Sequence, residues 1–254
     1  MPHDPPVSFP ARLHRFAAAR FSPEGEYGLH LTAGVLLLLL ATAVFARMAG
    51  AVVAGAPITQ LDVEVANWLH AHARANALPR QVLTAITHVH STPGILVLAA
   101  VAGAWLYRRR QRYWTVALAA SVPGGLVLNV LLKRSFERAR PHFAEPLLEL
   151  STYSFPSGHT MAATVLYGFI ACYASRHARG WAGRVLPFVL ALAMVATVAF
   201  SRMYLGVHYL SDVLAAAAEG CGWLAICITG AATLERRSRA RARRAGEAVA
   251  TQDI

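Results

Sequence analysis

Cysteine, charge and lysine are all scarce in this sequence, and the cysteines are the first to narrow the possibilities. The chain has three, Cys172, Cys221 and Cys227, all within long apolar stretches. Cys221 and Cys227 are six positions apart and would face different sides of a helix. The sequence therefore predicts neither a disulfide framework nor a cysteine metal site, and we interpret these residues as thiols packed between helices.

Charged residues make up only 15% of the 254 positions, whereas 56% are hydrophobic and the mean hydropathy is +0.43. Soluble globular domains carry about 25% charged residues. This composition excludes an ordinary soluble globule and indicates that the protein is embedded in a lipid bilayer.

Six apolar stretches have lengths that suit a bilayer crossing, which takes roughly 17 to 25 helical residues. They predict an all-α integral membrane protein with a bundle of six transmembrane helices over residues 29–234. The preceding segment, 1–28, lacks an apolar core followed by a cleavage site, so we expect no cleavable signal peptide. A basic tail follows at 235–254. The stretches are 29–46, 93–107, 113–132, 158–175, 185–201 and 208–234.

Sixteen of the 24 basic residues lie before the first stretch or after the second, fourth and sixth. Six crossings place these segments on one face, and the positive-inside rule makes that face cytoplasmic, with both termini inside. The basic tail is then an orientation anchor that attracts anionic membrane lipids, and we do not expect it to bind nucleic acid. We expect a bacterial inner-membrane protein.

Residues 58–92, between the first two stretches, are less apolar. Leu61, Val65, Trp68 and Leu69 recur there with helical spacing. They predict an amphipathic outer helix. It would lie on the membrane surface with Trp68 at head-group level, or pack over the bundle as a lid.

The only lysine, Lys133, opens a scattered polar pattern. Because odd stretches end and even stretches begin on one face, all parts of the pattern converge at the outer face. Charges at the bilayer centre cost roughly 2.5 to 3.5 kcal/mol each, so the site belongs at the membrane edge. The pattern is Lys133-x6-Arg140-Pro141, Pro156-Ser157-Gly158-His159 and Ser201-Arg202-x5-His208-x3-Asp212.

These residue types suit phosphoryl transfer. Lys133 and Arg140 are seven apart, two turns if the segment is helical, and Arg202 supplies a third cation for phosphate oxygens. Pro156 and Ser157 would open a helix whose free N–H groups face an anion, and Gly158 would let the backbone approach it closely.

Two histidines would then do opposite work in this pocket. Asp212 is four residues after His208, so its carboxylate can hold one ring nitrogen and leave the other free to attack phosphorus. His159 would protonate the leaving oxygen as a general acid.

At these motifs the sequence resembles the type 2 phosphatidic acid phosphatase superfamily. The linkers are also similar, as in Phe136-Glu137-Arg138-Ala139-Arg140-Pro141 and Leu205-Gly206-Val207-His208-Tyr209. The resemblance implies a six-helix membrane phosphatase without metal or cofactor, in which His208 forms a phosphohistidine supported by Asp212 and His159 is the leaving-group acid. It implies phosphate ligands at Lys133, Arg140, Ser157, Gly158 and Arg202.

We therefore expect a hydrolase of a lipid phosphate or diphosphate. Undecaprenyl diphosphate, phosphatidylglycerol phosphate and phosphatidic acid are candidates, with a polyprenyl diphosphate preferred by analogy. One alternative is a lipid phosphotransferase that passes the phosphoryl group to an alcohol. Another is a non-catalytic lipid transporter or scaffold, against which the intact His159, His208 and Asp212 argue.

Glu219 lies seven residues past Asp212, on the same helical face and deeper in the bilayer. Intramembrane carboxylates are often functional. Because the pocket already has an acid and a base, we expect Glu219 to be a neutral or hydrogen-bonded structural group, and Asn129 also to be structural. Pro123-Gly124-Gly125 would kink its helix or admit a close neighbour.

Overall fold

We describe the protein from a computed structural model covering residues 28–148 and 150–250, with side chains as far as Ala242. This part of the chain contains eight helices and no strand, so the all-helical prediction is confirmed for it. The helices are α2 (Leu29–Val53), α3 (Ile58–Ala75), α4 (Ala77–Val89), α5 (Thr92–Arg108), α6 (Arg112–Phe136), α7 (Gly158–His177), α8 (Gly180–Tyr204) and α9 (Leu210–Ala250).

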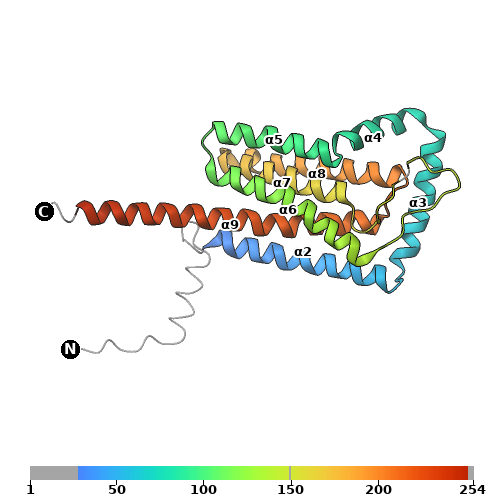
Figure 1. Ribbon diagram of the computed structural model, residues 1–254, viewed down its shortest axis with the longest axis horizontal. Coiled ribbons are helices and arrows are strands. Elements are labelled where there is room, and N and C mark those ends of the chain that lie inside the picture. Colours follow the sequence, from blue (N-terminus) through green and yellow to red (C-terminus); the bar gives the residue numbers. More distant parts are fainter. Residues whose placement is uncertain (1–27, 149, 251–254) are drawn as a thin grey trace, which may run out of the picture.

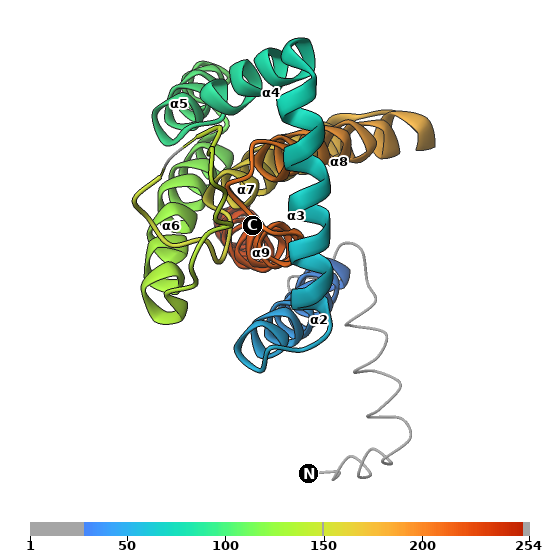
Figure 2. The ribbon, with the colours of Figure 1, turned by 90° about the vertical axis from the view of Figure 1, so that its right-hand side faces the viewer.

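Six of these helices, α2 and α5 to α9, run side by side along the long axis of the molecule (Figure 1). Helix α3 lies across one end of this bundle, and α4 leads from it back to α5 (Figure 2). Helix α9 packs against α2, α6 and α7. The second half of α9 projects from the opposite end of the bundle.

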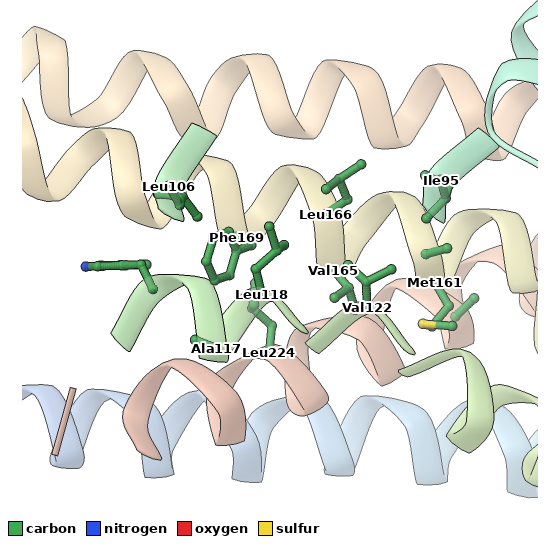
Figure 3. Close-up of a cluster of buried hydrophobic side chains, with 13 residues drawn as sticks. Ile95, Leu106, Ala117, Leu118, Val122, Met161, Val165, Leu166, Phe169 and Leu224 are labelled. Atoms are coloured by element: carbon green, nitrogen blue, oxygen red, sulfur yellow. The ribbon is translucent and has the colours of Figure 1, made fainter. Parts of the chain in front are cut away.

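Helix α7 lies in the centre of the bundle, where its apolar side chains form most of the core with those of α5, α6 and α9 (Figure 3). Phe169 of α7 meets Trp114 of α6 edge to face, with ring centroids 5.4 Å apart. Lipid tails are as apolar as these side chains. Close packing, more than transfer out of water, therefore stabilises the bundle within a membrane.

Among the described residues, four helices are individually long and apolar enough to cross a membrane: α2, α6, α8 and α9 over Leu210–Ala242. Helices α4 and α5 pass the same test as a pair that bends by 58°, which makes a fifth candidate. Helix α7 is not a candidate by hydropathy. Its neighbours enclose it, so its surface need not match lipid, and small and polar side chains such as Thr160 and Thr164 are tolerated there.

The Pro123-Gly124-Gly125 segment lies inside an unbroken α6. A Cβ atom at Gly124 would come within 2.5 Å of the Trp223 ring on α9, and one at Gly125 within 3.1 Å of Met161 on α7. The indole N–H of Trp223 donates to the Ser121 carbonyl at 2.8 Å. The expected close approach of neighbouring helices is thus confirmed.

The predicted amphipathic helix is present as α3, and protein covers only part of its apolar stripe. Leu69 is buried, but Leu61 and Trp68 are 45% and 61% exposed. The buried side chains include Asp62, Ala66 and Ala73 instead. The reason is that α3 covers the ends of α8 and α9, where polar backbone and side chains need a polar partner.

Basic segments gather at the end of the bundle opposite α3. Arg176, in the last turn of α7, forms an ion pair with Glu235 of α9 at 3.0 Å and lies over the Trp114 ring at the start of α6. The α5–α6 turn, with Arg108 and Arg112, is at this end too. Helix α9 continues past the last predicted membrane stretch into the basic tail, as far as Ala250.

Candidate active site

The eight sequence-predicted site residues lie at the end of the bundle that α3 covers. Here α6 and α8 end, α7 and α9 begin, and the loops 137–157 and 205–209 connect them (Figure 1). The predicted convergence of the three motifs on one end is therefore present in the structure. The residues are Lys133, Arg140, Ser157, Gly158, His159, Arg202, His208 and Asp212.

His208 lies in the loop just before α9 and is 2% exposed. Its Nδ1 is 3.3 Å from Asp212 Oδ2, and Arg140 Nη1 is 3.3 Å from its Nε2. A guanidinium can only donate, so Nε2 must accept, and the ring proton belongs on Nδ1, facing the carboxylate. Burial lowers the pKa of His208 to about 3, so the ring is neutral with a lone pair on Nε2.

Asp212 is fully buried in the first turn of α9, and both of its carboxylate oxygens accept hydrogen bonds. Oδ2 accepts from the Ser154 hydroxyl at 2.5 Å and from the Tyr209 N–H at 2.9 Å, in addition to His208. Oδ1 accepts from Arg138 Nη1 at 2.6 Å. The carboxylate that orients His208 is itself held in place.

Arg140 lies in the loop, because α6 ends at Phe136 and Glu137 has a left-handed φ of 46°. The helical case considered for Lys133 and Arg140 therefore does not apply, and only Lys133 lies in α6. Arg140 donates to the Thr152, Tyr153 and Val207 carbonyls and to the Thr152 hydroxyl. Burial lowers the pKa of Arg140.

Lys133 and Arg202 also have only neutral partners. Lys133 Nζ donates to the Tyr153 and Ser154 carbonyls, at 2.7 and 3.4 Å. Arg202 is 1% exposed, donates to the Thr87 hydroxyl at 3.1 Å, and has no partner for its Nε–H. Among the residues that the structure describes, no carboxylate forms an ion pair with Lys133, Arg140 or Arg202.

The first turn of α7 faces this group of cations. Ser157 precedes the helix but makes no side-chain cap hydrogen bond, so it leaves the first N–H groups unoccupied by its hydroxyl. Its own N–H donates to the Asp212 carbonyl at 3.2 Å. At Gly158, a Cβ atom would come 3.0 Å from Asn129 Oδ1, so any larger residue would have to displace the Asn129 side chain.

His159 follows in the same turn of α7. The charges of Arg202 and Arg140, and the rings of His208 and His90, act on it electrostatically. In residues 28–148 and 150–250 its ring has no hydrogen-bond partner. Both ring nitrogens are therefore available to a ligand.

Glu219 lies deeper in the bundle, and Asn129 joins it to the α7 end. Asn129 Nδ2 donates to Glu219 Oε2 at 2.9 Å and lies 3.5 Å from the Pro156 carbonyl. The expected hydrogen-bonded setting of both residues is present. Glu219 Oε1 is buried without a partner.

Arg138, Asp62, Ser154 and Ser211 belong to this site, and sequence reasoning did not identify them. Arg138 joins Asp212 to Asp62 of α3, across 74 and 76 positions of sequence. Asp62 could have been noticed in the sequence, because it is a carboxylate beside an apolar stripe and a buried carboxylate requires a partner. No pattern in one sequence names that partner.

The arrangement suits a tetrahedral anion with several oxygens. Three cations without anionic partners and an open helix N-terminus surround a neutral histidine that presents its Nε2 lone pair. Such an anion would compensate the cations and would replace His208 Nε2 as a partner of Arg140, which would release this nitrogen to act as a nucleophile.

Comparison with known proteins agrees with this chemistry. Residues 112–236 match the PAP2 superfamily. The chain is 35% identical over 135 residues to phosphatidylglycerophosphatase B of Bacillus subtilis, which is 53% of this chain. It is 38% identical over 133 residues to decaprenylphosphoryl-5-phosphoribose phosphatase of Mycobacterium tuberculosis, which is 50% of this chain. The chain spans 66% of the length of each of these relatives.

Two solved structures are similar. A transmembrane PAP2 type phosphatidylglycerolphosphate phosphatase from Bacillus subtilis aligns with a TM-score of 0.66 and 28% identity, covering 76% of this chain and 93% of that one. LpxE from Aquifex aeolicus, at 23% identity and a TM-score of 0.50, shares the fold over 65% of this chain and 94% of its own. The resemblance seen in the sequence motifs is confirmed, and residues 112–236 are a PAP2 superfamily domain.

Proposed function

We propose that this protein is a membrane phosphatase that hydrolyses a lipid phosphate through a phosphohistidine on His208. The observation that carries the proposal is the set of three buried or half-buried cations, Lys133, Arg140 and Arg202, with no carboxylate partner. A buried cation is costly unless an anion compensates it. A phosphate group would supply that anion and bring its phosphorus to His208.

The phosphate would be bound by the three cations, the Ser157 hydroxyl and the N–H groups of the first α7 turn. His208 Nε2 would attack phosphorus while the bond to the lipid oxygen breaks, and His159 would protonate that oxygen. Asp212 would stabilise the positive ring that forms. Water would then attack the phosphohistidine, losing a proton to His159, and release inorganic phosphate.

No metal is needed for this scheme, because the residues present can themselves compensate the phosphate charge. The Asp212 oxygens are occupied by Arg138, Ser154 and Tyr209. Mg²⁺ sites are instead built from carboxylates with free oxygens. Activity in the presence of a chelator would support this part of the proposal.

For the membrane arrangement we propose six crossings, with α5 and α7 completing the set, and the site on the outer face of the bacterial inner membrane. The collection of arginines at the other end of the bundle supports this orientation. The segments 1–28 and 235–254 would then be cytoplasmic. Labelling of single engineered cysteines in intact cells tests it: position 142 should react with an impermeant reagent and position 109 should not.

The names of two relatives support the choice of candidate substrates. One is named for phosphatidylglycerophosphate and the other for decaprenylphosphoryl-5-phosphoribose, so a glycerolipid and a polyprenyl lipid are both candidates. Both are phosphate monoesters on larger lipids. We therefore rank monoesters such as phosphatidylglycerol phosphate and phosphatidic acid beside undecaprenyl diphosphate.

The decisive experiment measures phosphate release from these lipids by the purified full chain in detergent, with chelator present. Wild type should release phosphate from at least one of them, and His208→Ala should lose at least about 10⁴-fold in kcat. His177→Ala, at the other end of α7 and exposed, is the matched control. Activity that persists in His208→Ala, or requires a metal, would overturn the mechanism.

A further inference from the structure

Asp62 is a fully buried carboxylate on α3, outside the residues that would bind phosphate. Its Oδ1 accepts the Ser211 N–H of α9 at 2.9 Å, and its Oδ2 accepts the Ser211 hydroxyl at 2.5 Å. Ser211 is the second residue of α9. Asp62 therefore places a negative charge at the positive end of that helix and satisfies one of its free N–H groups from another helix.

Arg138 joins this carboxylate to Asp212. One guanidinium nitrogen, Nη2, donates to Asp62 Oδ2 at 2.8 Å, and the other, Nη1, donates to Asp212 Oδ1 at 2.6 Å. Nη1 also lies 2.7 Å from the Ser211 hydroxyl. The guanidinium is 4.4 Å from the centre of the Tyr209 ring, which fixes its plane.

These contacts use three of the five N–H donors of Arg138, and both of its terminal nitrogens donate within the protein. Burial opposes its charge, but the carboxylates of Asp212 and Asp62 outweigh burial and raise the pKa of Arg138. The two carboxylates and the single guanidinium form one closed group whose outer member, Asp62, comes from the helix that lies across the bundle end (Figure 2).

We propose that Arg138 and Asp62 are positioning residues for the reaction. They hold the Asp212 carboxylate against His208 Nδ1, and thereby keep the Nε2 lone pair directed at phosphorus. They also make this alignment depend on the docking of α3 over the site. The inference rests on the proposed function, since it assigns both residues a part in the same histidine chemistry.

The test compares Arg138→Gln, Arg138→Lys and Asp62→Asn with wild type on the best lipid phosphate. Outer partners of catalytic groups typically contribute 10- to 100-fold, so kcat should fall about that much in Arg138→Gln while KM changes less than about threefold. Arg138→Lys keeps the charge without the fork and should recover part of kcat. Asp62→Asn should lose about tenfold.

Two exposed residues provide controls. Arg134→Gln removes a cation from the same end of α6, and Glu64→Gln removes an acid from α3. Both should retain wild-type kcat. If Arg138→Gln does not fold, Arg138→Lys and Asp62→Asn carry the same comparison.

A double mutant separates positioning from a merely structural role. If Arg138 acts through Asp212, then Arg138→Gln combined with Asp212→Asn should be no slower than Asp212→Asn alone. Independent, multiplying losses would overturn the proposal, as would an increase in KM at constant kcat, which would make Arg138 a phosphate ligand. A wild type inactive on every lipid phosphate would instead contradict the proposed function itself.

Discussion

Two arginines in one loop, Arg138 and Arg140, stand in opposite electrostatic surroundings. Arg138 lies between two carboxylates, whereas Arg140 donates only to carbonyls, a hydroxyl and a neutral histidine. The first is compensated within the protein; the second requires an anion from outside. The contrast teaches that the site has a closed half, which aligns His208, and an open half, which would bind phosphate.

His208 contacts both halves of the site. The largest loss of kcat in this comparison is expected when its contact with the closed half is changed. Asp212→Asn should lower kcat by about 10³- to 10⁴-fold, because an amide can donate to Nδ1 and favour the wrong ring tautomer. Rapid-quench measurement of phosphoenzyme formation should show the loss in the first chemical step. A variant that forms phosphoenzyme at the wild-type rate would contradict this role.

Substitution of the two arginines should separate activity from stability. Arg140→Gln should lose about 10²- to 10³-fold in kcat/KM, as when one oxyanion donor is removed. Its thermal stability should be unchanged or higher, because an uncompensated cation is gone. Arg138→Gln leaves two buried carboxylates unpaired and should lose about 3 to 5 kcal/mol of unfolding free energy.

Differential scanning fluorimetry in one detergent measures both variants together. Equal destabilisation by the two substitutions would remove the distinction between an open and a closed half. If Arg140→Gln were destabilised but fully active, Arg140 would not be a phosphate-binding residue.

Lowering the pH should destabilise the fold through His208, the residue that contacts both halves of the site. Burial lowers the pKa of His208 to about 3, below the unfolded value near 6.5, so the unfolded chain binds the proton more tightly between these values. The stability contribution of His208 is therefore complete above pH 6.5 and is lost progressively down to pH 3. The expected loss is on the order of 1 to 3 kcal/mol by pH 4.

His208→Gln should show a flatter stability profile over this range when unfolding is followed by tryptophan fluorescence. His177→Ala should keep the wild-type slope. A variant profile as steep as wild type would assign the acid sensitivity to other groups.

Much of the open half could be predicted from the sequence. Helix parity brought the three motifs to one end, and Pro156-Ser157 marked the start of α7. The sequence left open whether Lys133 and Arg140 share a helix; they do not, because Glu137 ends α6 in a left-handed conformation, which sequence alone does not signal for glutamate. The loop nevertheless returns Arg140 to His208.

The closed half could not be predicted in the same way. Asp62 and Arg138 are 76 positions apart, and Asp62 and Ser211 are 149 apart. Such pairings arise from how α3 packs over α9, not from local periodicity. The apolar stripe of α3 does not show which of its residues face the site, because a helix that covers polar helix ends buries polar residues.

The smallest effect is expected at Glu219, which lies deeper in the bundle than either half of the site. Its Oε2 accepts a hydrogen bond from Asn129 at 2.9 Å, while no cation contacts it directly. Glutamine has nearly the shape of a neutral glutamic acid and can accept the same hydrogen bond. Glu219→Gln should therefore keep kcat within about threefold and stability within about 0.5 kcal/mol.

Asn129→Ala provides the contrast, because it removes the partner of both Glu219 and the Pro156 carbonyl. It should cost more than Glu219→Gln in stability, since a buried carboxyl then loses its hydrogen bond at about 1 to 3 kcal/mol. If Glu219→Gln instead abolished turnover in a folded protein, the carboxyl proton would be required. The site would then have a third part in addition to its closed and open halves, a proton path from the bilayer interior to the α7 end.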